Sequence, residues 1–333
     1  KVERLKAMLS GKRNVLILAH KNPDGDAVGS MLGLAWMLKK HAGLGDEQFS
    51  LVLPNACPSS LSYLPGFDRI RFADREMEAS KEAFAKADLV IGVDFNNASR
   101  VGILQQQLEQ CVAPKLLIDH HHQPDERLFD LLFSEVDLSS ACELVYWVGR
   151  AAWGEECLSQ ESAQCLYNGL KTDTGSFAFS NDSPTLYEAA AEMVKFPIQP
   201  AAMHNELFND FSVRRLRFFA FCLSERMKVW EAKGFAYIYV SRSDMQRFQV
   251  DETDTEGLVN YTLLMRPIQV GVLVKETPAG VRLSFRSKKD FDVNQFARQH
   301  FEGGGHTKAA GGNSSLSLEE TCKKLETLIL PQL

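Results

Sequence analysis

The chain has 333 residues, of which 45% are hydrophobic and 24% are charged, and its formal net charge is −6. This length exceeds that of a usual single core, so the sequence predicts two domains. The negative charge argues against a protein that grips a long duplex, because such affinity comes from a broad basic surface. No apolar run approaches the roughly 18–20 residues that cross a bilayer, and the 7 cysteines lack metal-type spacing. We therefore expect a cytoplasmic globular protein with reduced thiols.

The first part of the chain alternates between patterns typical of strands and of helices. Nearly continuous apolar runs predict strands at 14–20, 49–54, 88–95 and 114–121. Helical spacing predicts helices at 27–43, 79–87 and 99–110. Strands separated by helices of this length indicate βαβ units. We expect an α/β catalytic domain over residues 1–185, with a mainly parallel sheet flanked by helices.

The rest of the chain divides into two further parts. Helical patterns dominate from Ser139 to Trp230, and residues 186–232 are assigned to a helical connector. Beyond it, apolar runs predict strands at 235–241, 268–277 and 280–288. Helices are expected at about 254–265, 292–300 and 317–330. Residues 233–333 are therefore predicted to form a smaller C-terminal α/β domain.

Polar side chains recur where the predicted strands end, which is where open parallel sheets bind their ligands. They lie in "HKNPDGDAVGS", "VDFNN", "LIDHHH" and, after a helix, "KTDTG". The candidate site residues in these stretches are His20, Asp24, Asp26, Asp94, Asp119, His120, His121 and Asp173. A single carboxylate such as Asp26 or Asp94 can instead be the N-cap of the next helix. Together, however, these residues predict one common site.

The mixture of imidazole and carboxylate groups predicts a divalent metal site. It suits Mn²⁺, with iron, cobalt, zinc or magnesium as alternatives, and it holds too many carboxylates for a thiolate-type zinc site. Carboxylates packed this closely would repel one another strongly, and two divalent ions would neutralise them. Two metal ions can activate water for attack on a phosphate, so no protein nucleophile is required. Cys142 is accordingly interpreted as a packing residue.

The four stretches, in this order, resemble the motifs of the DHH phosphoesterases, and "SSACELVY" (139–146) resembles a helix of that family. The resemblance implies that His20, Asp24 and Asp94 hold one metal. It implies that Asp26, Asp94, His120 and Asp173 hold the other, with Asp94 bridging. It leaves His121 to face the substrate phosphate, as a hydrogen-bond donor or acid, and Asp119 to support the cluster. His122 departs from the two-histidine motif and is interpreted as a solvated, peripheral residue.

Near the C-terminus, "EGGGHTKAAGG" (302–312), after "LSFRSKK" (283–289), resembles the DHHA1 substrate-binding domain. Gly303, Gly304 and Gly305 allow the backbone to approach an anion closely. His306 and Arg286 are expected to clamp a phosphate beyond the scissile one, Arg286 by a bidentate contact.

Length and organisation are similar to the bacterial bifunctional oligoribonucleases and pAp phosphatases (nanoRNases) of this family. That implies manganese-dependent hydrolysis of very short RNA to 5′-mononucleotides and dephosphorylation of pAp. Hydrolysis of linear pApA, a cyclic-dinucleotide product, is an alternative, and a RecJ-like exonuclease is less favoured. A non-catalytic nucleotide-binding regulator is the alternative from another class. The assembly state stays open, with a homodimer among the options. Arg214, Arg215 and Arg217 are interpreted as a solvated helix face, with a basic rail for RNA as the alternative.

Overall fold

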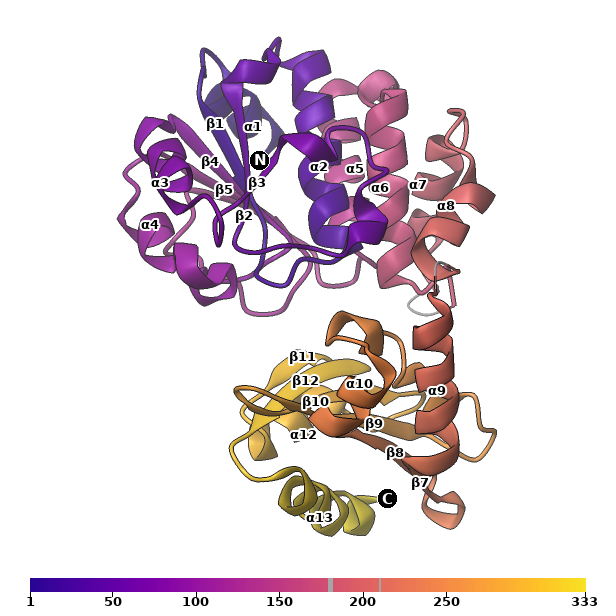
Figure 1. Cartoon of the computed structure of the whole chain (residues 1–333). Helices are drawn as coiled ribbons and strands as arrows, with labels where there is room; N and C mark the ends of the chain where they lie inside the picture. The colour runs from indigo at the N-terminus through magenta and orange to yellow at the C-terminus, as the bar shows by residue number, and fades with distance from the viewer. Residues whose placement is uncertain (179–181, 210) are drawn as a thin grey trace. The chain divides into compact units, whose positions relative to one another are not determined.

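The computed structural model describes residues 1–178, 182–209 and 211–333. The chain divides into two compact units, Lys1–Asp210 and Phe211–Leu333 (Figure 1). This division falls inside the range 186–232 that the sequence assigns to a connector. Among the described residues, no helix is long and apolar enough to cross a membrane.

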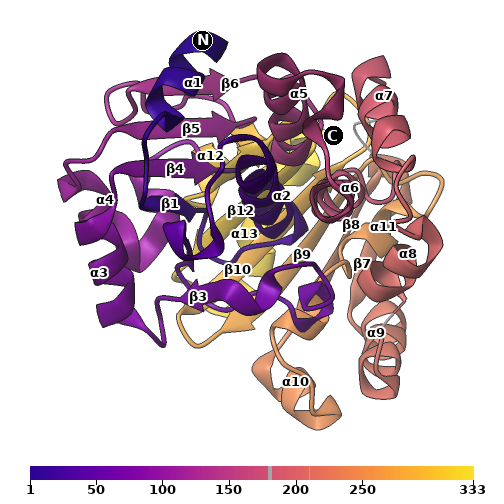
Figure 2. The ribbon, with the colours of Figure 1, turned by 90° about the horizontal axis from the view of Figure 1, so that it is seen from above.

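The first unit contains, within its described residues, one six-stranded parallel sheet in the order β3-β2-β1-β4-β5-β6. Figure 2 shows β6, β5, β4 and β1 side by side. The strands are β1 (Val15–Leu18), β2 (Phe49–Leu53), β3 (Ile70–Phe72), β4 (Leu89–Val93), β5 (Lys115–Asp119) and β6 (Leu131–Ser134). The chain runs outward from β1 through β2 and β3, then returns to β4 on the other side of β1. The carboxyl ends of β1 and β4 therefore meet at the point where the strand order reverses, which is where such sheets bind ligands.

Helices cover both faces of this sheet (Figure 1). They are α1 (Val2–Leu9), α2 (Gly25–His41), α3 (Met77–Lys86), α4 (Gln105–Gln110), α5 (Ala141–Trp153), α6 (Gln160–Asp173), α7 (Pro184–Met193) and α8 (Pro200–Phe208). Successive residues of β1 point to opposite faces. Val15 and Ile17 join the core with α2, α5 and α6, whereas Leu16 and Leu18 join the core with α3 and α4.

The sequence predicted the strands β1, β2, β4 and β5 of this sheet correctly but missed β3 and β6. The single helix predicted at 99–110 is wrong. Residues Ala98–Leu104 form 3₁₀ turns, and α4 follows them. The interruption is at Gly102, whose φ of 53° is incompatible with a continuous right-handed helix.

The second unit contains, in its described part, a six-stranded mixed sheet in the order β11-β12-β10-β9-β8-β7. Its strands are β7 (Met227–Trp230), β8 (Phe235–Val240), β9 (Val270–Thr277), β10 (Gly280–Ser287), β11 (Gly304–His306) and β12 (Ala309–Ser314). Its helices are α9 (Val213–Glu225), α10 (Arg242–Phe248), α11 (Asn260–Leu263), α12 (Val293–His300) and α13 (Leu318–Ile329). One apolar core packs against α12 and α13, and the other lies beneath α9 and α10.

The strands predicted at 235–241, 268–277 and 280–288 are confirmed as β8, β9 and β10. The run of helices predicted to reach Trp230 ends at Glu225, because Met227–Trp230 pairs with β8 as a strand. The helix predicted at about 254–265 is reduced to the 3₁₀ turn Thr253–Thr255 and the four-residue α11. Gly257, with a φ of 79°, separates the two.

Candidate metal and phosphate site

The turn after β1 brings two of the predicted ligands together at the start of α2. His20 is buried, and its Nδ1–H donates to the carbonyl of Lys21 at 2.8 Å, which directs Nε2 toward the carboxylates. Asp24 is the N-cap of α2, with Oδ1 accepting from the backbone N–H groups of Asp26 and Ala27 at 3.0 and 3.1 Å. Its other oxygen, Oδ2, lies 3.8 Å from His20 Nε2. Asp24 therefore serves as a helix cap and a candidate ligand at once.

Asp94 directly follows β4 and lies at the centre of the site. Its Oδ2 is 3.3 Å from His20 Nε2, and its Oδ1 is 3.6 Å from His120 Nε2. The backbone of Asp94 has a φ of 60°, a left-handed conformation that aspartate tolerates better than most residues. Burial disfavours the charged carboxylate, but hydrogen bonds from His120 and His20 outweigh it and hold the pKa of Asp94 well below its usual value.

Asp26 is fully buried and is held by the N-terminus of α5. Its Oδ2 accepts from Ala141 N at 2.6 Å, and its Oδ1 accepts from Cys142 N at 2.9 Å. These N–H groups belong to the first turn of the helix, where they have no intrahelical partner and the helix dipole favours a negative charge. The Cys142 thiol donates to the Asp26 carbonyl at 3.6 Å, and burial, followed by the charge of Asp26, raises its pKa well above the usual value. This inert environment agrees with packing rather than nucleophilic catalysis.

β5 ends in the Asp-His-His stretch, and its residues point in different directions. His120 is buried, its Nδ1–H donates to the Leu138 carbonyl at 3.3 Å, and its Nε2 lies 3.8 Å from Asp26 Oδ2. His121 Nδ1 donates to Asp119 Oδ1 at 2.7 Å. Asp119 is fully buried, and its Oδ2 has no hydrogen-bond partner among the described residues. His122 is exposed, as predicted.

Asp173, the last residue of α6, reaches the same centre from a helix that packs against α2. Its Oδ2 lies 3.5 Å from His120 Nε2. The pKa of Asp173 is raised well above its usual value, first by burial and then by the carboxylates of Asp26 and Asp24. Burial and the neighbouring Asp94 likewise raise the pKa of Asp26 to about 7. The site therefore carries more negative charge than its own imidazoles compensate.

Among the described residues, Asp94 is shared by three groups of candidate ligand atoms, each with all its atoms within 4.8 Å of one another, and one of these groups joins it to Asp119 and His121. The other two contain the predicted metal ligands. One consists of His20, Asp24 and Asp94, and the other of Asp26, Asp94 and His120. Asp173 adjoins the second group through its 3.5 Å approach to His120. Buried carboxylates with raised pKa values, facing imidazole nitrogens whose other nitrogen is anchored, fit divalent metal ions.

The sequence did not reveal two residues of α6 that support this centre. Asn168 on α6 donates from Nδ2 to the Gly25 carbonyl at 3.0 Å and accepts from Tyr63 at 2.7 Å, which fixes the turn before α2. A Cβ on Gly169 would lie 2.7 Å from Asp26 Oδ1, so only glycine lets α6 pass this close. Neither residue carries a pattern that sequence reasoning could use, because each acts through the docking of α6 on α2.

The predicted substrate-binding residues of the second unit lie on β10 and on the hairpin of β11 and β12. Arg286 Nη1 donates to its neighbouring Phe285 carbonyl at 3.0 Å. Gly304 and His306 pair with β12, and the N–H of Gly305 donates to Asn294 Oδ1 at 2.9 Å. A Cβ on Gly303 would lie 2.0 Å from the Gly311 carbonyl, so the glycines permit close packing of this hairpin.

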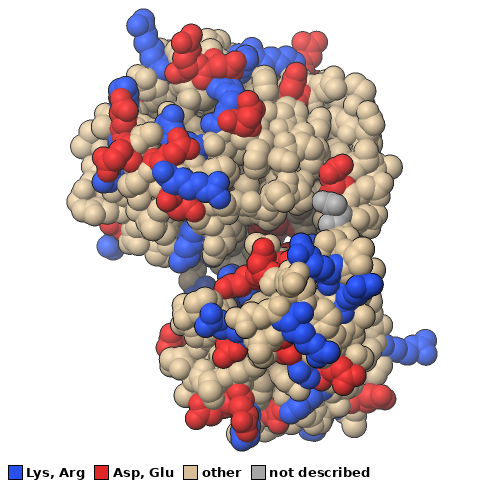
Figure 3. Space-filling view, viewed as in Figure 1, with Lys and Arg blue, Asp and Glu red and all other residues tan. Residues whose placement is uncertain are grey.

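The arginines of α9 differ from one another. Arg215 lies 3.8 Å from the ring centroid of Phe211 and donates to the carbonyls of Asp254 and Glu256, so it anchors a loop. Arg214 and Arg217 are exposed, and basic side chains gather on the face of this unit seen in Figure 3.

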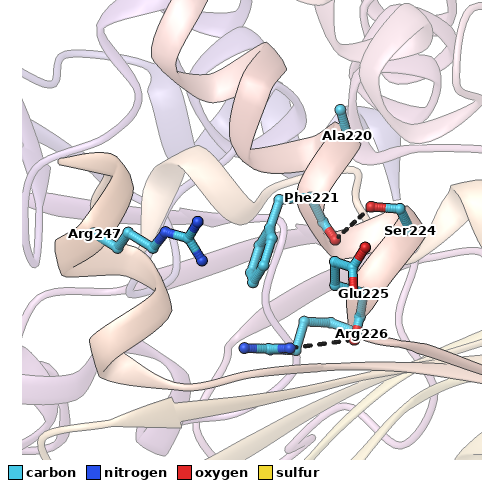
Figure 4. A pocket seen from close by; sticks show the side chains of 6 residues that line it. All are labelled: Ala220, Phe221, Ser224, Glu225, Arg226 and Arg247. Atoms are coloured by element: carbon cyan, nitrogen blue, oxygen red, sulfur yellow. Dashed lines mark hydrogen bonds between the residues drawn. The ribbon is translucent and has the colours of Figure 1, made fainter.

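A hollow between α9 and α10 contains Phe221, with Arg226 and Arg247 on its ring at 4.6 and 5.1 Å (Figure 4). Arg226 is paired with Asp244 at 2.9 Å. No group of metal-binding side chains lies among the residues that line this hollow.

Comparison with known families agrees with this geometry. Residues 14–170 match the DHH family, N-terminal domain, and residues 233–329 match the DHHA1 domain. The two models together account for about three quarters of the chain, which therefore belongs to the DHH family and carries a DHHA1 domain.

Two curated relatives and one solved structure match nearly the whole chain. A probable bifunctional oligoribonuclease and PAP phosphatase NrnA from Streptococcus mutans is 27% identical over 92% of this chain and 92% of its own length. The bifunctional oligoribonuclease and PAP phosphatase NrnA of Bacillus subtilis is 28% identical over 90% of this chain and 88% of its own. The crystal structure of an exopolyphosphatase-related protein from Bacteroides fragilis superposes with a TM-score of 0.93 at 29% identity, covering 99% of this chain and 95% of that one.

Proposed function

We propose that the protein is a metal-dependent phosphoesterase that hydrolyses very short RNA to 5′-mononucleotides and dephosphorylates pAp. The observation that carries this proposal is the pair of ligand groups that share Asp94 at the carboxyl ends of β1 and β4. The names of the curated relatives support the choice of short RNA and pAp as substrates. All of the expected ligand positions are filled by residues that can bind metal, which argues against a non-catalytic regulator.

In this proposal His20, Asp24 and Asp94 hold one ion, while Asp26, Asp94, His120 and Asp173 hold the second. Mn²⁺ suits this combination of imidazole and carboxylate ligands best. Bound at this position, the ions supply Lewis acidity toward a phosphate and activate water at neutral pH. The backbone N–H groups at the start of α5 hold Asp26 in place, and the Lys21 and Leu138 carbonyls orient the two imidazoles.

His121 is assigned to the substrate phosphate. Its Nδ1–H is donated to Asp119, so the ring orientation is fixed and Nε2 points away from that carboxylate. In its protonated form Nε2–H donates a hydrogen bond to a phosphoryl oxygen or a proton to the leaving oxygen. In the second unit, Arg286, His306 and the glycines 303–305 are assigned to the phosphate next to the scissile one.

A direct assay of the purified protein tests this function. With added Mn²⁺, we expect hydrolysis of pAp and of dinucleotide RNA, with turnover that falls steeply on a long single strand and is lost with a chelator. Linear pApA, the alternative substrate, is assayed in parallel so that its rate of hydrolysis can be compared with those of pAp and dinucleotide RNA. Equal rates on dinucleotides and on long strands, or hydrolysis that a chelator leaves unchanged, would contradict the proposal.

The assignment of Arg286 and His306 predicts a loss of substrate capture. A charge-assisted pair with phosphate is worth roughly 1.5–3 kcal/mol, so Arg286→Ala is expected to raise KM for pAp by about ten- to a hundredfold. His306→Ala is expected to act in the same direction. Bound metal, and cleavage of an activated phosphodiester that lacks a second phosphate, should be preserved. Equal losses on both kinds of substrate would place these residues in support of the metal centre instead.

A further inference from the structure

Glu143 on α5 is a fully buried carboxylate to which the proposed mechanism gives no role. Its Oε2 accepts from the backbone N–H of Ser139 at 2.9 Å and from the Ser139 hydroxyl at 2.7 Å. Its Oε1 accepts from the Thr185 hydroxyl at 2.7 Å. Among the described residues, no Lys, Arg or His nitrogen lies within 4.0 Å of this carboxylate. The side chain is therefore held by neutral donors alone.

The peptide group that Glu143 binds is also the one that anchors His120. The Ser139 N–H and the Leu138 carbonyl belong to the same peptide unit, which is planar and rigid. Glu143 accepts from the N–H edge of this unit, and the carbonyl edge accepts from His120 Nδ1 at 3.3 Å. A rotation of the peptide would break both hydrogen bonds. Glu143 therefore helps to fix the orientation of the His120 imidazole.

The same residue is tied to the start of α5, which holds Asp26. The Glu143 N–H donates to the Ser140 hydroxyl, the N-cap of this helix, at 3.0 Å. The two residues after Ser140, which are Ala141 and Cys142, donate hydrogen bonds from their N–H groups to the Asp26 carboxylate. Glu143 therefore binds the residues that lead into the first turn of α5, and that turn fixes Asp26, a second candidate ligand.

We propose that Glu143 is a positioning residue that sets the orientation of His120 and the placement of Asp26, and through them the affinity of the site for metal. It acts by hydrogen-bond geometry, holding the Leu138–Ser139 peptide in one orientation. The inference rests on the proposed function, since it concerns the same metal site. Replacement of a residue that orients a metal ligand through hydrogen bonds typically changes metal affinity or activity by 10- to 100-fold.

Two substitutions at this position separate geometry from charge. Glutamine has the same shape, and its amide oxygen can accept both hydrogen bonds from Ser139. Its NH₂ group can donate to the Thr185 oxygen, whose hydroxyl can then donate to Ser183, 2.6 Å away. Alanine removes every one of these bonds. Glu143→Gln should therefore preserve the peptide orientation, and Glu143→Ala should release it.

Asp244 provides a matched control for general destabilisation. It is a buried acid in the first turn of α10, and it accepts from the backbone N–H and the hydroxyl of Ser241 at 3.1 and 2.8 Å. Asp244→Ala thus removes the same kind of serine contact in the second unit, together with the ion pair to Arg226. It is expected to lower the melting temperature without weakening Mn²⁺ binding.

The experiment is calorimetric titration of Mn²⁺ into the four metal-free proteins, wild type and three variants, each with all 333 residues, with a melting curve of each. We expect Mn²⁺ affinity about 10- to 100-fold weaker for Glu143→Ala, and affinity within about threefold of wild type for Glu143→Gln and Asp244→Ala. Unchanged affinity in a folded Glu143→Ala protein would overturn the inference, as would an equal loss in Glu143→Gln or in Asp244→Ala. If Glu143→Ala does not fold, the Gln variant decides, because a weakened affinity there means that charge, not geometry, matters. Failure of the wild type to bind Mn²⁺ would instead count against the proposed function itself.

Discussion

Replacement of Asp94 by asparagine is expected to lower kcat for pAp and dinucleotide RNA by at least about a thousandfold, which corresponds to roughly 4 kcal/mol of lost transition-state stabilisation. The reason is geometric: Asp94 faces His20 with one oxygen and His120 with the other, so it belongs to both ligand groups. An amide keeps only one ligand oxygen and no charge. Asparagine also tolerates the positive φ of this position, so the backbone should be retained. Steady-state kinetics at saturating Mn²⁺, with a melting curve, measures the effect.

The matched control is Asp74→Asn. Asp74 is an exposed carboxylate just beyond β3, another parallel strand of the same sheet, and it is absent from both ligand groups. Its variant should turn over pAp like the wild type. Near-normal turnover by a folded Asp94→Asn protein would refute the bridging assignment.

Replacement of His121 by asparagine is expected to lower kcat by about a hundred- to ten-thousandfold, the range typical of a lost general acid or base. Asparagine can place an amide N–H close to the position of Nδ1, so the hydrogen bond to the buried Asp119 should survive. It has no group at the position of Nε2, which is assigned to the phosphate. The affinity for Mn²⁺ should change little, because His121 is not assigned as a ligand of either ion.

His122→Ala is the neighbouring control. His122 is exposed, and within the described part of the chain only its backbone carbonyl is bonded, accepting from Asn96 at 2.7 Å. Its kinetics should match those of the wild type. If His121→Asn loses metal together with activity, His121 is a ligand, and its role in binding the phosphate would have to be abandoned.

The structure brings the predicted ligands together because every one but Asp173 lies just after a strand or begins the next helix. An apolar run such as "NVLILAH" shows where a strand ends, and parallel strands bring their carboxyl ends to one edge of the sheet. Asp173 lies instead at the end of a helix, α6, and the sequence indicated it as the aspartate before the Thr-Gly turn of "KTDTG", a stretch that also resembles a family motif.

What the sequence missed depends on contacts between distant segments. The strand β3 has only three residues, and β6 lacks the longer apolar run that identified the equally short β1. The hairpin of β11 and β12 is rich in glycine and was interpreted only as an anion-binding loop. Glu143 could be suspected from the Ser-x-x-Glu pattern that begins α5, but its link to His120 exists only once the loop after β6 lies against β5.

The proposed two-metal centre is tested most directly by titrating Mn²⁺ into the metal-free protein and following it by electron paramagnetic resonance. We expect two tightly bound ions per chain, with the spin coupling of neighbouring ions that share a carboxylate, and loss of that coupling in Asp94→Asn. A single bound ion, or two uncoupled ions that Asp94→Asn leaves unchanged, would contradict the two-metal proposal.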